Sequence, residues 1–552
     1  MRHRRASLKA VQSAGRQPQV EALTVVVDVR PIRDARSVVR ELSKRIGLQR
    51  PQIQQVTADG AEWEVEPRAR VAPGRAWDLA AALRAQPEVV HAEPMFRSLV
   101  PENVTRRGPR ASGGVAEHDP TTDNDFDWSL RKANVIDAWP LFGTRPPGAG
   151  IRIGHPDTGY TPHPELADPG RLLIAEGYDF DDDDADPLDD LNADFLDNPS
   201  HGTGTGSVIL SGVGPASGGP GPFVSGSAPN ALLIPIRTTE TVVLFSMRNL
   251  RRALDHATTH GSHVVSISLG GPFAGFGLSN SIARAVDGGT IVLAAAGNEV
   301  GFVVFPAAFD DVIAVAATNI RDVPWVGSSN GEAVDISAPG ESVWRALTLR
   351  NPGGQFEFSV ERGTGTSFAV ATTAGVAALW VSYHGWAVLV RKYGARNVAR
   401  VFKQLLQSTS RRPAGWDTTR YGAGIVDARR LLSEPLPAVA PARKLRDGRR
   451  AAVAVDTTGI ETLVHLMPEV SRTRVEELVA EMLHVTDRDL PRVLQDHGAE
   501  LAFQLAMQPA VLATLRRVAR GGKAAAANRR TVRRKLSAAS LSSRLRRQIT
   551  RG

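Results

Sequence analysis

The sequence predicts an α/β fold built on a doubly wound parallel sheet, preceded by a smaller α+β module and followed by a small helical domain. Two observations predict the sheet: six short runs of apolar or small residues recur between residues 151 and 337, and helical segments separate several of them. Strands buried on both faces have this composition, and repeated β–α–β units imply parallel strands with right-handed crossovers. A third observation is the length, because 552 residues exceed one typical domain.

Residues 1–120 are expected to contain a basic N-terminus, a compact module and a linker. Between residues 23 and 94 the order is strand, helix, strand, strand, helix, strand, which is the split β–α–β or ferredoxin-like pattern. The expected strands are 23–31, 53–58, 62–67 and 88–94, and the expected helices are 35–47 and 75–86. Residues 101–120 are rich in Pro, Gly, Arg and Ser, a composition typical of a linker.

Residues 121–435 are expected to form the sheet domain. The predicted strands are 151–155, 231–237, 263–269, 290–296, 312–318 and 333–337. Two predicted helices, 247–261 and 279–289, lie between successive strands, and each ends with a glycine helix stop.

The remainder of the chain is expected to divide into a helical domain, 436–510, and a basic tail, 511–552. Segments 460–485, 490–505 and 510–519 have helical spacing. The tail carries thirteen Lys or Arg and no Asp or Glu, so the net charge of +8 leaves −5 for the rest of the chain. Such a tail predicts weak polyanion binding through counterion release, or else a solvated extension. It has no aromatic residue, so base stacking is not expected.

Composition excludes several classes of protein. Cysteine is absent, which excludes disulfides, thiolate catalysis and Cys-based zinc sites. No apolar run approaches ~18 residues, so no membrane-spanning helix is expected. The basic, polar N-terminus lacks the apolar core of a secretory signal. The compartment stays open, with the cytoplasm as the default expectation.

Four polar residues stand where a site on a parallel sheet should lie, beyond the carboxyl ends of the strands. Asp157 follows the strand 151–155, and Asn298 follows the strand 290–296. His201 lies in SHGTGTG before an apolar helical run, and Ser367 lies in GTGTSFAVATTAGVAALW at the start of another. A serine nucleophile needs an imidazole to take its proton, a carboxylate to orient that imidazole and a donor for the oxyanion. His155 and His163 lack the HGTGTG setting and are interpreted as surface or turn histidines.

The segments DTGYTPHPEL, SHGTGTGSVI, SLGG, AAAGNE and GTSFAVATTAGVAAL resemble the subtilisin-like serine peptidases, and the likeness extends over about residues 127–432. The chain order Asp, His, Ser is also the order of that family. The resemblance implies peptide-bond hydrolysis without a required cofactor, with Asp157, His201 and Ser367 as the triad and Asn298 as the oxyanion donor. It further implies a zymogen whose N-terminal module is a propeptide and inhibitor, and we expect self-processing within residues 97–119.

The resemblance also implies where substrate binds. The S1 pocket is expected between two walls, and its floor is expected just before Pro306, at a position that is commonly Gly and is Val304 here. The wall and floor residues are Ser268, Leu269, Gly270, Gly271, Gly297 and Val304.

The chain departs from the family pattern without losing a triad group. Phe368 follows the nucleophile where Met is usual, and Ala371 and Thr372 replace a Pro and a His. Gly204 replaces a second His, and Pro156 directly precedes Asp157. These differences predict a divergent member that acts on proteins or peptides. The alternative is a catalytically silent peptide-binding module, against which the intact triad argues.

The acidic run 179–190 raises the question of a structural calcium ion. Oxygen-rich clusters suit Ca²⁺, but a run of charges is also typical of a solvated loop. The family's usual Asn-rich calcium loop is replaced here by the Gly- and Pro-rich segment 214–226. Structural calcium therefore stays open, and no residue is assigned as a metal ligand.

Overall fold

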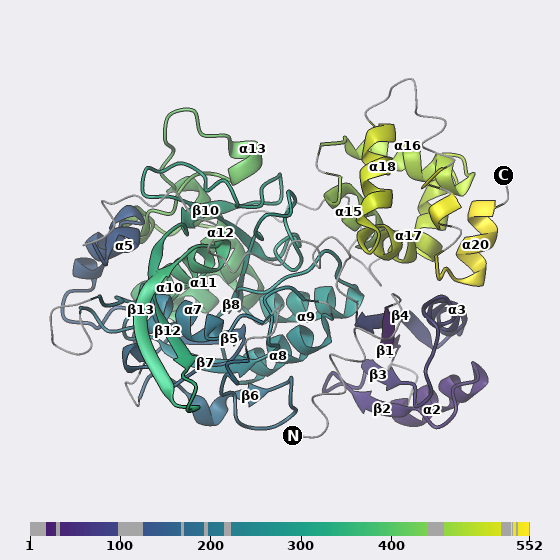
Figure 1. The fold of residues 1–552 in the computed structure, drawn as a ribbon, viewed down its shortest axis with the longest axis horizontal. Helices are drawn as coiled ribbons and strands as arrows, with labels where there is room; N and C mark the ends of the chain where they lie inside the picture. Colours follow the sequence, from purple (N-terminus) through teal and green to yellow (C-terminus); the bar gives the residue numbers. More distant parts are fainter. Residues whose placement is uncertain are drawn as a thin grey trace.

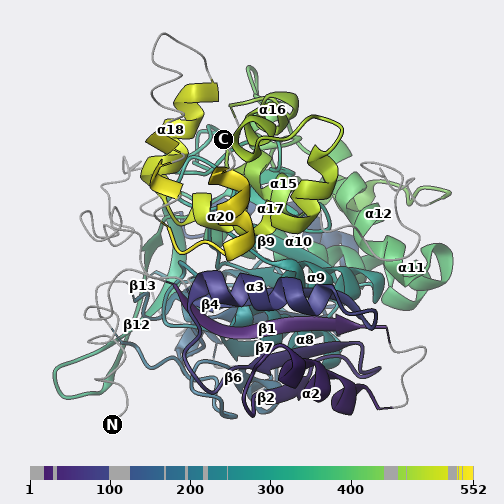
Figure 2. The same cartoon turned by 90° about the vertical axis from the view of Figure 1, so that its right-hand side faces the viewer.

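The structure is a computed structural model. It describes residues 18–28, 34–97, 125–166, 170–192, 197–214, 222–244, 246–439, 458–467, 469–519, 531–532, 534–536 and 539–550. The chain forms three parts: an N-terminal module (18–97), a central domain (125–439) and a C-terminal domain (458–550). Figures 1 and 2 show the N-terminal module and the C-terminal domain next to each other on one side of the central domain.

The central domain is built on a seven-stranded parallel sheet with the order β11–β10–β9–β8–β5–β7–β6. All six predicted strands are confirmed, and the short edge strand β6 was not predicted. The strands are β5 (Arg152–Asp157), β6 (Tyr178–Asp179), β7 (Leu232–Arg237), β8 (Val264–Ile267), β9 (Ile291–Ala295), β10 (Ile313–Thr318) and β11 (Ile336–Pro339).

Helices cover both faces of this sheet, which is why its strands are apolar on both sides. Successive residues of β5 face opposite ways. A Cβ on Gly154 would lie 2.5 Å from Ala257 of α8, whereas the next residue, His155, contacts Thr205 of α7. The helix α10 packs against α7 and along β8 to β11, and α9 packs against α8. The predicted doubly wound α/β fold is therefore confirmed (Figure 1).

The helices of the central domain, with the hairpin that covers α7, complete this layer structure. The hairpin was not predicted, although β13 alternates apolar and polar residues as a half-exposed strand does. The α-helices are α5 (Trp128–Lys132), α6 (Val135–Ala138), α7 (His201–Leu210), α8 (Arg248–Thr259), α9 (Phe276–Asp287), α10 (Thr366–His384), α11 (Trp386–Tyr393), α12 (Ala395–Ser408), α13 (Thr418–Tyr421) and α14 (Ala428–Ser433). The 3₁₀ helices are η2 (Trp139–Phe142), η3 (Pro164–Leu166) and η4 (Ile174–Glu176), and the hairpin is β12 (Val343–Arg350) with β13 (Phe356–Gly363).

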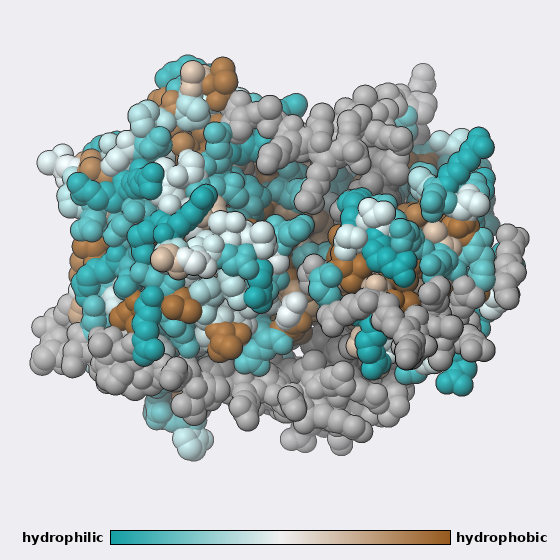
Figure 3. Space-filling view, turned by 90° about the horizontal axis from the view of Figure 1, so that it is seen from above, coloured by the Kyte–Doolittle hydropathy of each residue, from teal (hydrophilic) through white to brown (hydrophobic). Residues whose placement is uncertain are grey.

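The helix α10 is the core helix of this domain. Within the described part of the chain it alone is long and apolar enough to cross a bilayer, but 89% of its apolar window is buried inside the protein. Its composition is explained by the sheet and helices that enclose it. Seen from above, the described residues in Figure 3 are mostly hydrophilic, with hydrophobic residues in small separate groups.

The N-terminal module has the predicted ferredoxin-like pattern. Its antiparallel sheet has the order β2–β3–β1–β4, and two helices cover one face. Trp63 and Val65 of β3 are buried towards those helices, and the alternate residues Glu62 and Glu64 point the other way. The elements are β1 (Gln19–Val27), α2 (Ala35–Arg45), β2 (Gln52–Gln55), β3 (Glu62–Glu66), α3 (Pro73–Arg84) and β4 (Val89–Arg97).

Acidic residues of the N-terminal module face α8 and α9 of the central domain. Glu62 pairs with Arg251 at 3.0 Å and with Arg284 at 2.7 Å. Glu93 accepts a hydrogen bond of 3.0 Å from the backbone N–H of Gly277, in the first turn of α9. A carboxylate at a helix N-terminus is favoured by the helix dipole. Charge-assisted hydrogen bonds thus help to hold the module on the central domain.

The C-terminal domain extends beyond the boundary that the sequence predicted. A basic tail was expected from residue 511, but its described parts include α18 and α20, and Leu515, Leu545 and Ile549 are buried in the helical core. Leu545 and Ile549 are four residues apart and share one face of α20, while arginines occupy the other; the charge concealed this pattern. The helices are α15 (Thr458–His465), α16 (Arg472–Leu483), α17 (Leu490–Ala506), α18 (Pro509–Ala519) and α20 (Ser543–Thr550).

Candidate active site

The site begins with a buried carboxylate at the end of a central strand. Asp157 is the last residue of β5 and is fully buried. Its Oδ1 accepts hydrogen bonds from the Thr158 N–H at 2.8 Å and from His201 Nδ1 at 2.6 Å, and its Oδ2 accepts from Thr205 Oγ1 at 3.2 Å. Burial raises the pKa of Asp157, but the charge and hydrogen bond of His201 outweigh this effect and hold that pKa below its usual value.

The imidazole of His201 is oriented by this carboxylate. An ionised Asp157 requires a proton on Nδ1, which leaves Nε2 as the basic nitrogen. The His201 side chain is 14% exposed, so one edge can reach a substrate. The backbones come together closely here, because a Cβ on Gly202 would lie 2.1 Å from the Gly159 carbonyl oxygen. Glycine at position 202 therefore permits the approach of α7 to the loop after β5.

Ser367 lies in the first turn of α10, at the positive end of the helix dipole. Its carbonyl oxygen accepts a hydrogen bond of 3.3 Å from Ser268 Oγ. Within the described part of the chain there is no hydrogen bond between the Ser367 hydroxyl and the His201 imidazole. Contacts of this kind are often loose without substrate. The packing of α7 against α10 sets the relation between the two residues.

The side-chain amide of Asn298 has a defined orientation. Its Oδ1 accepts hydrogen bonds from Thr366 N at 3.0 Å and Thr366 Oγ1 at 2.9 Å. A backbone N–H can only donate, so the oxygen must face Thr366 and Nδ2 must face away from it. A Cβ on Gly365 would lie 3.2 Å from this Nδ2. Asn298 thus keeps a donor beside the residues that lead into Ser367.

The expected S1 residues surround Val304. A Cβ on Gly270 would lie 2.5 Å from Val304 Cγ2, and a Cβ on Gly297 would lie 2.9 Å from Val304 Cγ1. Gly271 and Phe305 exchange two backbone hydrogen bonds of 2.9 Å, and the Phe305–Pro306 peptide is cis. The two walls and the floor of the expected pocket are therefore adjacent. The Leu269 side chain, by contrast, is buried in the core.

Asp189 is a positioning residue that the sequence did not indicate. Its Oδ2 accepts hydrogen bonds from Thr158 Oγ1 at 2.8 Å and from the N–H of Ser200 at 2.9 Å. It therefore ties the residue after Asp157 to the residue before His201. Burial raises the pKa of Asp189 to about 6. Its position at the end of an acidic run concealed it, because such a run is typical of a solvated loop.

His155 and His163 were expected at the surface or in turns; His155 instead lies within β5, and His163 lies in the turn before η3. His155 and His163 are both buried. His155 Nε2 lies 3.0 Å from Thr205 Oγ1, which in turn donates to Asp157. Burial lowers the pKa of His155, which favours a neutral ring. His155 and Thr205 together form a polar layer behind the buried carboxylate.

The acidic run that suggested calcium surrounds a buried arginine. Arg237, the last residue of β7, is 1% exposed. Its guanidinium pairs with Asp179, with Asp182 at 3.0 Å and with Asp190 at 3.2 Å. These carboxylates already have a cationic partner, so they do not fit a calcium cage. Among the residues that the structure describes, no group of three His, Cys, Asp or Glu side chains is arranged to hold a metal ion.

Comparison with known proteins shows which family the chain resembles. The model of the subtilase family matches residues 148–424. The chain is 30% identical over 311 residues to a thermophilic serine proteinase of Bacillus sp. strain AK1, covering 54% of this chain and 65% of that protein. It is 29% identical over 268 residues to thermitase of Thermoactinomyces vulgaris, covering 47% of this chain and 86% of thermitase. The chain thus spans just under two thirds of the first relative.

A solved structure extends the likeness in fold. The structure of fervidolysin from Fervidobacterium pennivorans, described as a keratinolytic enzyme related to subtilisin, matches with a TM-score of 0.54 and 21% identity. The match covers 76% of this chain and 62% of that chain. At this identity the likeness concerns the fold alone.

Proposed function

The chain belongs to the subtilase family of serine peptidases, and on that premise we propose that it is a serine endopeptidase made as a zymogen, with Asp157, His201 and Ser367 as its triad. The observation that carries this proposal is the 2.6 Å hydrogen bond between the buried Asp157 carboxylate and His201 Nδ1. It supports a role for His201 Nε2 as the base.

In the proposed mechanism, Ser367 Oγ attacks the carbonyl carbon of the scissile peptide while His201 Nε2 takes the hydroxyl proton. Asp157 stabilises the imidazolium that forms. The negative oxygen of the tetrahedral intermediate receives hydrogen bonds from Asn298 Nδ2 and the Ser367 N–H. His201 then returns its proton to the leaving amine, and water hydrolyses the acyl-enzyme by the same steps.

A fluorophosphonate probe tests this proposal, because it phosphonylates only an activated serine. We expect labelling at Ser367 in protein freed of its N-terminal module, none in Ser367→Ala, and normal labelling in the control Ser382→Ala on the same helix. Asp157→Asn should lower kcat by about 10⁴-fold, the size of effect known for loss of the orienting carboxylate. Folded protein that stays unlabelled would favour the alternative, a silent peptide-binding module.

Several contacts support the zymogen part of the proposal. The N-terminal module is a complete ferredoxin-like unit that is held on α8 and α9 by buried ion pairs. The window proposed for self-processing, 97–119, lies outside the described residues after Arg97. In this proposal the module remains an inhibitor until that connection is cut and the module departs.

A further inference from the structure

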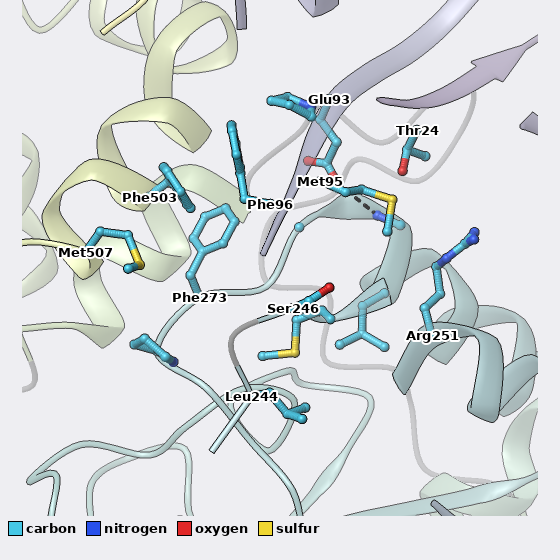
Figure 4. Close-up of a pocket in the computed structure, with 16 residues that line it drawn as sticks. Thr24, Glu93, Met95, Phe96, Leu244, Ser246, Arg251, Phe273, Phe503 and Met507 are labelled. Carbon is cyan, nitrogen blue, oxygen red and sulfur yellow. Dashed lines mark hydrogen bonds between the residues drawn. The ribbon is translucent and has the colours of Figure 1, made fainter. Parts of the chain in front are cut away.

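The three parts of the chain meet at one aromatic cluster. Phe503 of α17 stacks on Phe96 of β4 with ring centroids 4.3 Å apart, and it contacts the edge of Phe273 of the central domain at 5.3 Å. Trp77 of α3 lies 6.3 Å from the same ring. Figure 4 shows Phe503, Phe96 and Phe273 pointing toward one another at the pocket between the parts.

Phe503 belongs to the core of the N-terminal module more than to the core of its own domain. It is 2% exposed and packs within the cluster formed by Leu79, Leu83 and the other apolar residues of the module. Without the module, the Phe503 ring would lose its contacts with Phe96 and Trp77 and become more exposed to water. Burial of this kind is typical of the central residue of a binding interface.

Polar contacts beside this cluster join α3 to the C-terminal domain. Asp78 accepts hydrogen bonds from the Ser543 N–H at 3.0 Å and from Ser543 Oγ at 2.9 Å, so it caps the N-terminus of α20. A Cβ on Gly74 would lie 2.1 Å from the Leu541 carbonyl oxygen, so glycine permits the close contact between the two backbones. Figure 2 shows α17 and α20 lying directly above α3.

We propose that the C-terminal domain is a binding module for the N-terminal module and retains it on the central domain after the connecting chain is cut. The module is contacted on two faces, by α8 and α9 through Glu62 and by the C-terminal domain through α3. Its departure requires both sets of contacts to break, because a partner held at two sites rebinds at a high effective concentration. The inference rests on the proposed zymogen function and names a partner that regulates it.

The test measures how fast the cut module leaves. Ser367→Ala protein with a recognition site for an added protease placed within residues 98–120 is cut by that protease, so the cut does not depend on the chain's own activity. The protein is held on a resin through a C-terminal tag, and the release of the N-terminal fragment is followed over time. Phe503→Ala should speed release by about tenfold or more, as loss of a central aromatic residue does in other interfaces.

Two further variants make the result decisive. Asp78→Ala removes the cap on α20 without touching either core and should speed release by about threefold to tenfold. Glu41→Ala on α2, whose ion pairs stay within its own helix, is the control and should not change release. If both Phe503→Ala and Asp78→Ala are folded and release the fragment at the parent rate, the inference is wrong. If Phe503→Ala does not fold, Asp78→Ala alone decides in the same way.

The outcomes for this inference and for the proposed function are separable. Retention that depends on Phe503 stands even if Ser367 fails to react with the fluorophosphonate, because the added protease makes the cut. Conversely, rapid release from every variant leaves the triad untouched and refutes only the role of the C-terminal domain.

Discussion

Replacing Val304 should change which side chain the enzyme accepts at P1. The two methyl groups of Val304 lie between the walls of the expected pocket, within 2.5 and 2.9 Å of where a Cβ on Gly270 or Gly297 would stand. A β-branched side chain is stiff about χ1, so Val304 cannot swing aside as a longer, unbranched side chain could. We therefore expect the floor to be raised and small P1 residues such as Ala to be preferred over Phe or Tyr.

The size of this preference follows from the atoms that must be accommodated. A Phe ring that enters a pocket filled by three extra carbon atoms overpacks it, which costs about 1–3 kcal/mol. At about 1.4 kcal/mol per factor of ten, this is roughly a fivefold to hundredfold difference in kcat/KM. Val304→Gly removes those three atoms, and it should restore cleavage after Phe by a factor in the same range.

The assay compares kcat/KM on matched peptides that differ only in P1 Ala or Phe. Val300→Gly is the control, because Val300 lies in the same loop but is 46% exposed; it should leave the preference unchanged. A preference of the unmodified enzyme for Phe would refute the reasoning and show that the floor of the pocket is built from other residues. A Val304→Gly enzyme that is active but unchanged in preference would refute it equally.

Three further predictions concern activation, pH and charge. Ser367→Ala protein purified alone should stay uncut within residues 97–119, as judged by intact mass and N-terminal sequencing, and clipping there would disprove self-processing. Burial raises the pKa of Glu165 to about 7, above its ordinary value of 4.5, so ionisation should destabilise the fold as pH rises from about 4.5 to about 7. In the Ser367→Ala background, Glu165→Gln should remove up to about 3 kcal/mol of that loss; equal shifts of the urea midpoint between pH 5 and pH 8 in both proteins would contradict this. Binding to heparin should be weak and salt-sensitive, and it should weaken when three exposed cationic residues of the C-terminal segment are replaced by Ala: Arg534, Lys535 and Arg547. The log–log salt slope should then fall by up to about 0.9 for each cationic side chain removed, and unchanged retention on the column would disprove the prediction.

The heparin test uses substitutions and not a truncation, because the sequence did not predict the folded helices of the C-terminal segment. Deleting the chain after Pro509 would not test charge alone, because it would also remove Leu515 and Leu545 from a folded core. The buried strands were predictable because two covered faces leave an apolar run. An amphipathic helix eight residues long, such as α20, gives a weaker signal, and a high density of arginine obscured it.

The residues of the site, like the elements of the fold, could be predicted only in part. Asp157 and Asn298 follow apolar strands, and parallel strands bring such ends together, so their positions followed from the order of the chain. Asp189 did not, because its role depends on contacts with Thr158 and Ser200 that local sequence does not encode. His155 was misinterpreted because its position also depends on a tertiary contact: successive side chains of β5 face opposite ways, and that of His155 faces Thr205 of α7.

The buried guanidinium of Arg237 gives the acidic loop beside the active site a counter-ion that is part of the polypeptide. A bound metal ion is exchanged with its surroundings, is removed by chelators and depends on the free ion concentration. A covalently attached cation is present once in every chain, and an arginine stays charged over the whole pH range in which proteins fold. Arg237 therefore supplies one positive charge to this loop whatever the ionic composition of the medium.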